Sequence, residues 1–162
     1  LGPKVSRGEV DKVEALTAAS IAAGAEVMLR GGPLREGAFE KGHWMAPTVL
    51  RVADNQVPVM REEVFGPVAL LEPVDSFDAA IARVNDSDFG LQAGVFTGNL
   101  AHAMRAWDRI EAGGVVVGDV PSFRVDNMPY GGIKDSGCGR EGVKYAIRDM
   151  TEERLLVIRD PA

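Results

Sequence analysis

Segments of helical periodicity alternate with short apolar runs along most of the chain, and this alternation constrains the fold more than any other feature. Ser6 and Glu9 have the spacing of a capping box, and apolar residues then recur at helical intervals until Gly24. The run over 25–29 is typical of a buried strand, because it is short, apolar and followed by glycines and a proline. We therefore expect the chain to open with a helix and then a strand.

The same order recurs further along the chain. Residues 44–52 are expected to be extended, and the stretch over 64–74 has the Val and Leu content of a strand buried on both faces. Either Asp75 or Ser76 is expected to cap the helix that follows. This gives a second unit of strand and helix.

A third unit leads to the fold class. Residues 93–96 are expected to form a strand, Asn99 to cap a helix, and Gly113 and Gly114 to stop that helix before a strand over 115–117. The helix carries an apolar stripe of Leu100, Ala103, Met104, Trp107 and Ile110. Alternating strands and helices predict an α/β fold with a mostly parallel sheet, flanking helices and right-handed crossovers.

The rest of the chain holds one long irregular stretch and a distinct end. Residues 119–142 are rich in Gly and Pro, and loops of this length in compact domains are usually functional. A last helix is expected over 143–150. The sequence ERLLVIRD then has the alternating character of an edge strand, which can pair with a partner sheet. We therefore divide the chain into a main body over 1–150 and a terminal strand within 151–162.

Composition excludes several kinds of partner. A chain of 162 residues can form one compact core, so a single domain is the default. The 18 Lys and Arg residues are scattered and are outnumbered by 24 Asp and Glu, so no stripe of positive charge is available for nucleic acid. No apolar run approaches the roughly 20 residues that cross a bilayer, and no secretion signal is visible. We expect a cytoplasmic protein that binds neither nucleic acid nor membranes; its first residue is Leu1 rather than Met, which leaves room for a preceding segment.

Cys138 is the only cysteine, so the chain has no internal disulfide. With only His43 and His102 to join it, no structural zinc site is expected and no metal is assigned. The thiol lies near Arg140, which could stabilise a nucleophilic thiolate, but no histidine is close in sequence. The favoured interpretation is a small residue that fills a space in a glycine-rich loop.

The sequence GCGREG, residues 137–142, matches the G-x-G-x-x-G pattern of dinucleotide-binding turns and precedes a helix. That mechanism needs a buried strand that enters the turn, so that a pyrophosphate meets the helix N-terminus. The preceding residues are instead rich in Pro and Gly. We therefore favour glycines that let an irregular loop pack tightly, with a small independent nucleotide-binding domain as the alternative.

The sequence REEVFGPV, residues 61–68, places two carboxylates before an expected strand. A carboxylate at a strand entrance can accept hydrogen bonds from the vicinal hydroxyls of a ribose. Two adjacent glutamates are also common on a solvated surface, which is the favoured interpretation of Glu62 and Glu63 when they are taken alone.

Two long segments together resemble the aldehyde dehydrogenase superfamily. REEVFGPV and MPYGGIKDSGCGREG resemble two signature segments of this family, in the same order and at a similar separation. The opening LGPKVS, the stretch from Gly31 to Leu50 and the terminal TEERLLVI also resemble their counterparts, so almost every residue is covered. The resemblance implies the C-terminal part of the catalytic domain, followed by an oligomerisation strand at about 154–158 that pairs with a neighbouring subunit of a homo-oligomer.

The resemblance also implies roles for individual residues. Glu63 matches the glutamate that binds the nicotinamide ribose hydroxyls of NAD or NADP, and Phe65 matches the phenylalanine that packs near the nicotinamide. Tyr130 matches an aromatic residue near the substrate tunnel. Arg140 and Glu141 are expected to support the surrounding loop.

The catalytic groups of the family are not matched in this sequence. In the family a cysteine thiolate attacks the aldehyde, NAD(P) accepts a hydride, and a glutamate activates the water that releases the acid. The resemblance places the nucleophile, the glutamate, an oxyanion-stabilising asparagine and the Rossmann-like domain before Leu1. Cys138 occupies a variable position of its motif and is not assigned as the nucleophile. We therefore expect this chain alone to be inactive, as part of a dehydrogenase that oxidises an aldehyde to a carboxylic acid.

The segment VPSFRVDNMPYGG carries a hint about the aldehyde. Ser122 and Arg124 resemble residues in branches of the family that oxidise small polar or anionic aldehydes, such as lactaldehyde, glyceraldehyde phosphate or phosphonoacetaldehyde. Arg124 could bind a substrate carboxylate or phosphate, and the alternative is a structural ion pair with Asp126 or another acidic residue. For the chain as a whole, the alternative to a dehydrogenase is a non-catalytic binding or assembly module that retains the fold.

Overall fold

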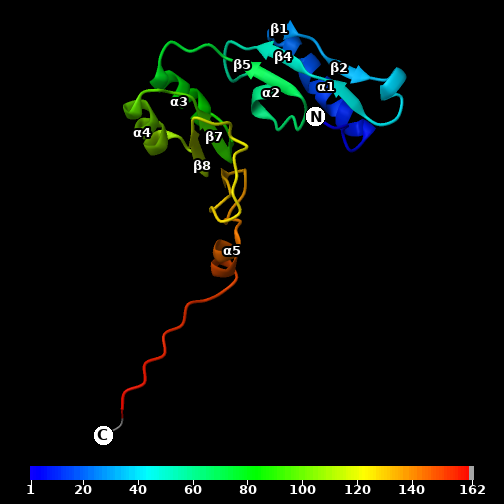
Figure 1. Cartoon of the computed structure of the whole chain (residues 1–162). Coiled ribbons are helices and arrows are strands. Elements are labelled where there is room, and N and C mark those ends of the chain that lie inside the picture. Colours follow the sequence, from blue (N-terminus) through cyan, green and yellow to red (C-terminus); the bar gives the residue numbers. More distant parts are fainter. Residues whose placement is uncertain (161–162) are drawn as a thin grey trace. The chain divides into compact units, whose positions relative to one another are not determined.

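The computed structural model describes residues 1–160, and these form two compact units (Figure 1). The first unit is Leu1–Ser87, and the second begins at Asp88. The single domain expected from the chain length is therefore divided into two, and each unit has its own strands and helices.

The first unit is built on a three-stranded sheet and a separate hairpin. Its elements are α1 (Arg7–Ala22), β1 (Glu26–Leu29), β2 (Gly32–Leu34), the 3₁₀ helix η1 (Gly37–Phe39), β3 (Trp44–Ala46), β4 (Thr48–Arg51), α2 (Pro58–Arg61), β5 (Val68–Leu71) and α3 (Phe77–Asn85). Strand β4 lies in the centre of the sheet, antiparallel to β1 and parallel to β5. Strands β2 and β3 form an antiparallel pair.

Helix α1 begins and ends where its sequence predicts. The Ser6 hydroxyl accepts a hydrogen bond of 3.3 Å from the Glu9 backbone N–H, which satisfies one of the free donors of the first turn. The helix ends at Ala22, and Gly24 takes a φ of 104°, which a residue with a Cβ rarely adopts. The buried face of α1 consists of Val10, Val13, Leu16, Thr17 and Ser20.

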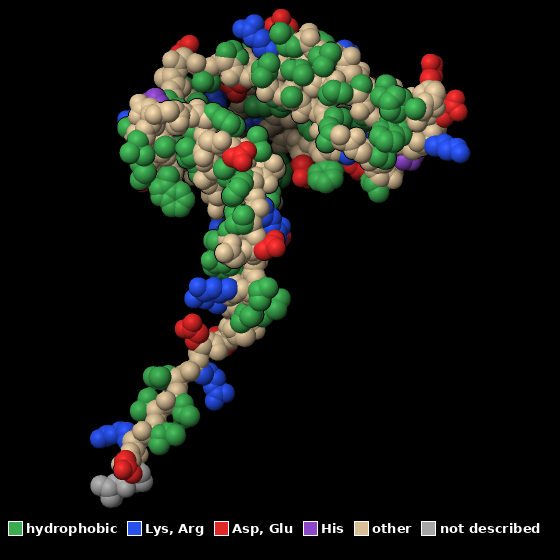
Figure 2. Space-filling model, viewed as in Figure 1, with side chains coloured by type: hydrophobic (Ala, Val, Ile, Leu, Met, Phe, Trp, Pro, Cys, Tyr) green, Lys and Arg blue, Asp and Glu red, His purple; other side chains and the backbone are tan. Residues whose placement is uncertain are grey.

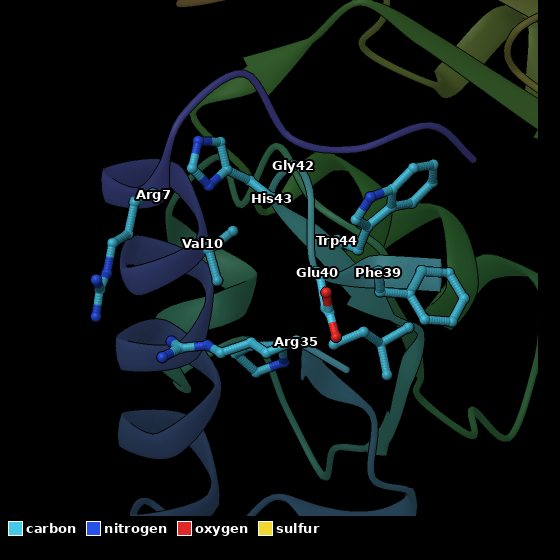
Figure 3. A pocket seen from close by; sticks show the side chains of 10 residues that line it. Arg7, Val10, Arg35, Phe39, Glu40, Gly42, His43 and Trp44 are labelled. Carbon is cyan, nitrogen blue, oxygen red and sulfur yellow. The ribbon is translucent and has the colours of Figure 1, made fainter. Parts of the chain in front are cut away.

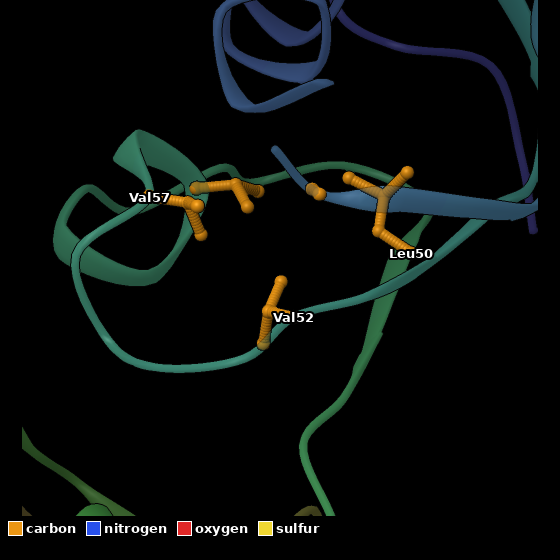
Figure 4. Close-up of a cluster of buried hydrophobic side chains, with 5 residues drawn as sticks. Leu50, Val52 and Val57 are labelled. Atoms are coloured by element: carbon orange, nitrogen blue, oxygen red, sulfur yellow. The ribbon is translucent and has the colours of Figure 1, made fainter. Parts of the chain in front are cut away.

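The core of the first unit lies between the sheet and α2. It consists of Ala25, Leu50, Val52, Val57 and Val59. Leu50, on β4, is completely buried, and Figure 4 shows it with Val52 and Val57 around a common interior. Buried Ser20 connects α1 to this core, because its hydroxyl accepts a hydrogen bond of 3.0 Å from the backbone N–H of Val59 in α2.

The second unit contains a parallel strand pair joined through a helix. Its elements are β6 (Phe89–Gly90), β7 (Gln92–Val95), α4 (Leu100–Arg109), β8 (Gly114–Val117), β9 (Ile133–Lys134) and α5 (Val143–Asp149). Strands β7 and β8 pair in parallel, with α4 between them in the chain, and β6 pairs antiparallel with β9. Asn99 caps α4 as expected, because its side-chain oxygen accepts from the backbone N–H of Ala101 at 2.8 Å.

The α/β fold class is confirmed. Within the described residues the strand pairing is mixed, with two parallel and three antiparallel pairs, where the alternating pattern had favoured a mostly parallel sheet. The antiparallel pairs are β2 with β3, which form a hairpin, β1 with β4, which follows that hairpin, and β6 with β9.

The burial expected from the sequence was wrong for β1, for β5 and for the apolar stripe of α4. All four residues of β1 are exposed, and β5 alternates between half-buried and exposed residues, so neither strand is buried on both faces. On α4 only Ala106 is buried, while Leu100, Met104 and Trp107 of the expected apolar stripe are exposed. A periodicity in the sequence marks an apolar face but cannot reveal whether another element covers it.

The end of the chain differs from the compact units. Residues 151–160 form neither a helix nor a strand, and all are exposed. Figure 2 shows both hydrophobic and charged side chains along this stretch. The strand expected at about 154–158 is therefore not formed within this chain, and its pairing with another subunit stays a prediction. The last two residues of the expected terminal segment over 151–162 lie outside the described residues. No helix in the described part of the chain has the length and apolar character to cross a membrane.

Candidate functional site

The loop over residues 62–67, which follows α2, carries the first group of candidate residues. Arg61, at the end of α2, binds both carboxylate oxygens of Asp86, with distances of 3.1 Å and 3.2 Å. Asn55 donates to the backbone oxygens of Arg83 and Asp86 at 3.0 Å and 2.8 Å. The start of the loop is therefore tied to the end of α3.

The ion pair between Arg61 and Asp86 also affects the titration of the Asp86 carboxyl. The hydrogen bond from Arg61 lowers the pKa of the Asp86 carboxyl below its ordinary value, and its positive charge acts in the same direction. Desolvation opposes this effect, while Asn55 and Arg83 add smaller contributions that lower the pKa further.

Glu63 presents its carboxylate to solvent. The side chain is exposed, and within residues 1–160 its carboxylate makes no hydrogen bond or ion pair. Its backbone oxygen accepts a hydrogen bond of 3.1 Å from Nζ of Lys12 on α1, so the main chain is held while the carboxylate stays available. A free carboxylate can accept hydrogen bonds from two vicinal hydroxyl groups.

Phe65 is held with its ring outward. Its backbone has a φ of 47°, which is uncommon for a residue other than glycine, and the residue is 71% exposed. Lys4 donates a hydrogen bond to the Phe65 carbonyl, and its Nζ lies 5.0 Å from the centre of the ring. Gly66 comes so close to α1 that an added Cβ would lie 2.6 Å from Val13, which fixes the loop against the helix.

A cavity of about 530 Å³ opens beside the Phe65 ring. Its lining residues are mainly apolar and come from the chain start, β3 and the 62–67 loop: Leu1, Gly2, Pro3, Lys4, Val5, Met45, Phe65, Gly66 and Pro67. An exposed aromatic ring, a nearby cavity and a free carboxylate two residues away could hold a sugar and an attached flat ring.

The second unit holds the other candidate residues, Tyr130 and Arg124. The guanidinium of Arg124 lies over the Tyr130 ring, 4.7 Å from its centre, and forms an ion pair of 2.9 Å with Glu141. Tyr130 and Glu141 also form an isolated antiparallel bridge through their backbones. The structural ion pair that was the alternative role of Arg124 is therefore formed, and its acidic partner is Glu141 rather than Asp126.

Arg140 supports the loop as expected. Its Nη1 donates to the backbone oxygens of Gly132 and Gly139 at 2.9 Å and 2.7 Å. Glycines make this packing possible, because a Cβ at Gly113 would lie 1.7 Å from the oxygen of Gly131. The side chain of Tyr130 is thus attached to a densely packed glycine framework.

The GCGREG segment does not have the surroundings of a dinucleotide-binding turn. The strand before it, β9, has only two residues, and α5 has only seven. Gly137, Gly139 and Gly142 all take positive φ values, as expected for an irregular loop. Cys138 is exposed, so the interpretation that it fills a space in the loop was wrong. It borders a cavity of about 330 Å³ together with Gly131, Gly132 and Gly139.

A further cavity, of about 220 Å³, lies between α1 and the β2–β3 hairpin (Figure 3). Arg7 and Val10 contribute from α1, and Arg35, His43 and Trp44 contribute from the hairpin. Sequence patterns did not indicate this cavity. Among residues 1–160, no group of three or more His, Cys, Asp and Glu side chains is arranged to hold a metal ion.

Sequence reasoning also missed Lys4 and Lys12, which hold the 62–67 loop. The two hydrogen bonds that they donate span 61 and 51 residues of the chain. No local motif signals such contacts, and only the resemblance of LGPKVS and REEVFGPV to segments of one family connected these two regions.

Comparison with known proteins decides the family. The model of the aldehyde dehydrogenase family matches residues 1–156. The chain belongs to the aldehyde dehydrogenase family.

Curated relatives within the family act on small aldehydes. The chain is 46% identical to 3-sulfolactaldehyde dehydrogenase of Priestia aryabhattai over 158 residues, which are 98% of this chain and 32% of that protein. It is 40% identical to sulfoacetaldehyde dehydrogenase of Neptuniibacter caesariensis, with 98% and 33% covered. It is 36% identical to lactaldehyde dehydrogenase of Methanococcus maripaludis, with 99% and 33% covered. The chain thus spans about a third of the length of these relatives.

Solved aldehyde dehydrogenases have the same fold over this region. Aldehyde dehydrogenase 21 of Physcomitrella patens, in complex with its reaction product succinate, matches with a TM-score of 0.89 and 40% identity over 99% of this chain and 32% of that one. Betaine aldehyde dehydrogenase of Staphylococcus aureus with NAD+ matches with 0.84 and 32%, covering 91% and 30%. The glyceraldehyde-3-phosphate dehydrogenase of Methanocaldococcus jannaschii with NADP matches with 0.79 and 34%, covering 92% and 31%.

Replacing Arg61 by Gln should raise the pKa of Asp86 toward its ordinary value of 3.8, because the hydrogen bond that lowers it is lost. A carboxyl group whose pKa is lowered by folding stabilises the folded state above its unfolded pKa, and this contribution disappears as the pH falls through the folded pKa. The unfolding free energy of the wild type should therefore exceed that of Arg61→Gln by most near neutral pH, and this difference should shrink below about pH 4.

Titration of the Asp86 carboxyl by NMR, with chemical unfolding at several pH values, measures both effects. Arg51→Gln is the control, because it removes an exposed pair with Glu26 and leaves Asp86 untouched. An unchanged Asp86 titration in Arg61→Gln would contradict the assignment.

Proposed function

We propose that this chain forms part of an NAD(P)-dependent dehydrogenase that oxidises a small polar or anionic aldehyde to its carboxylic acid. Membership of the family supports the reaction class, and the small acidic or hydroxylated aldehydes named for the relatives support the substrate class. The observation that carries the proposal in this chain is that one loop exposes both the Glu63 carboxylate and, two residues later, the Phe65 ring.

In this proposal the 62–67 loop holds the nicotinamide end of the coenzyme. Glu63 accepts hydrogen bonds from the ribose hydroxyls, and Phe65 packs against the nicotinamide ring and limits its movement. The bound NAD(P) accepts the hydride that leaves the aldehyde carbon. Lys12 and Lys4 hold the main chain of the loop, so that the two side chains keep their positions.

Tyr130 and Arg124 would border the substrate. The ring of Tyr130 supplies an apolar wall, and the Arg124 guanidinium supplies positive charge for a carboxylate, sulfonate or phosphate group. Glu141 forms an ion pair with the guanidinium, which also lies over the Tyr130 ring. These two contacts orient Arg124 before a substrate binds. Donors of Arg124 that do not face Glu141 remain for the substrate.

The nucleophilic cysteine and the base glutamate would come from outside these 162 residues. The single cysteine, Cys138, lies in the glycine-rich loop and is not assigned to attack the aldehyde. The terminal stretch at about 154–158 would pair with another subunit of a homo-oligomer, which suits its exposed backbone and exposed apolar side chains.

In the full-length polypeptide that contains this chain, Glu63→Gln should weaken binding of NAD(P) by about tenfold, because charge-assisted hydrogen bonds to the ribose become neutral ones. Isothermal titration calorimetry measures the dissociation constants. Glu62→Gln is the matched control, since it changes the adjacent exposed glutamate. Equal affinities for all three proteins would remove Glu63 from the coenzyme site.

Arg124→Gln should reduce the preference for anionic over neutral aldehydes by about ten- to a hundredfold, because a charge-assisted contact to the substrate is lost. The measured quantity is the ratio of kcat/KM for an anionic and a neutral aldehyde of similar size. Arg124→Lys keeps the positive charge and should retain most of the preference. An unchanged ratio in Arg124→Gln would assign Arg124 a structural role with Glu141 alone.

The purified 162-residue chain should show no aldehyde-dependent reduction of NAD+ or NADP+, because the proposed nucleophile lies elsewhere. Absorbance at the wavelength of the reduced nicotinamide measures this, with full-length enzyme as the positive control. Activity that is lost in Cys138→Ser would instead make this cysteine the nucleophile and would overturn the assignment of the catalytic groups.

A further inference from the structure

Lys4 makes three contacts that converge on Phe65 or its surroundings. Its Nζ donates to the Phe65 carbonyl, lies 5.0 Å from the centre of the Phe65 ring and is 3.6 Å from a carboxylate oxygen of Glu9. The Lys4 side chain is only 12% exposed, so this charge is held in place rather than moving freely in solvent.

These contacts fix both the backbone and the ring of one residue. Phe65 has a positive φ, and a hydrogen bond to its carbonyl restrains the peptide that follows. The cation over the ring restrains the side chain, because the face of an aromatic ring attracts positive charge. With Lys4 over one face of the ring, and Phe65 as a residue 71% exposed, the opposite face remains open to a ligand.

The charge of Lys4 has a consequence for a nicotinamide on that open face. The oxidised ring carries a positive charge, and the reduced ring is neutral. A fixed cation on the far side of Phe65 therefore repels the oxidised ring and leaves the reduced ring unaffected. The mainly apolar lining of the adjacent cavity weakens solvent screening of this repulsion.

We infer that Lys4 is a positioning residue of the coenzyme site, which fixes Phe65 and shifts the relative affinity of the site toward the reduced coenzyme. The inference rests on the proposed function, in which Phe65 packs against the nicotinamide. Destabilising the oxidised ring relative to the reduced one favours hydride acceptance. Lys4 acts through Phe65 and the electric field of its charge, and it is not assigned any contact with the coenzyme.

Glu9 provides an internal test of the charge effect. Its carboxylate partly neutralises Lys4 at 3.6 Å, so removing the negative charge strengthens the field of Lys4. Glu9→Gln and Lys4→Met should consequently change the relative affinity for the two coenzyme forms in opposite directions. General loosening of the site would weaken binding of both forms together and would not produce opposite changes.

The experiment measures dissociation constants for oxidised and reduced coenzyme in the full-length polypeptide that contains this chain. Lys4→Met should lower the ratio of the NAD(P)+ to the NAD(P)H dissociation constant by about three- to tenfold. Glu9→Gln should raise it, and Lys4→Arg, which keeps the charge, should stay near the wild-type ratio. Arg7→Met removes a charge that is 72% exposed and should leave the ratio unchanged.

The inference is overturned if Lys4→Met and Glu9→Gln leave the ratio unchanged or shift it in the same direction. Failure of the proposed function gives a different result. If Glu63→Gln and Phe65→Ala leave the affinity for both coenzyme forms at the wild-type value, the coenzyme does not bind at this loop. If those two variants weaken binding while the Lys4 variants keep the wild-type ratio, only the inference about Lys4 fails. Lys4→Arg guards against loss of folding, because it keeps the donor and the charge.

Discussion

A hydroxyl group buried between two helices holds the first unit together. Ser20 is fully buried on α1, donates to the oxygen of Leu16 at 2.8 Å and accepts from the backbone N–H of Val59 at 3.0 Å. Val59 lies in the first turn of α2, where N–H groups have no partner within the helix, and a buried donor without a partner would cost roughly 1 to 3 kcal/mol. The position of α2, and of the 62–67 loop that continues from it, therefore depends on this contact.

Local signals in the sequence located α1, α3 and α4 well, whereas the short helices η1 and α2 were not predicted. Ser6, Ser76 and Asn99 each cap a helix through a hydrogen bond to a backbone N–H two or three residues away, so their geometry is contained in a few consecutive residues. Burial depends on what covers a surface, and that information is not local. The apolar run over 25–29 was therefore recognised as a strand, while its exposure was not.

The same distinction applies to the candidate site. Glu63, Phe65, Tyr130 and Arg124 were proposed from resemblance to a family and a short motif, but the residues that hold them come from distant parts of the chain or from a backbone bridge. Glu141 reaches Arg124 because Glu141 and Tyr130 pair through their backbones across the glycine-rich loop. Spacing along the sequence could not select Glu141 over Asp126 as the acidic partner.

The left-handed backbone of Phe65 lowers the stability of the loop. For a residue with a Cβ, this conformation costs about 1 kcal/mol or more relative to an ordinary one, and glycine would avoid most of that cost. Glycine would also leave the loop without a large flat surface toward solvent, where the ring is held. Selection for thermal resistance alone should accordingly favour glycine at this position. In the proposed function, the aromatic side chain is retained because it contacts the coenzyme.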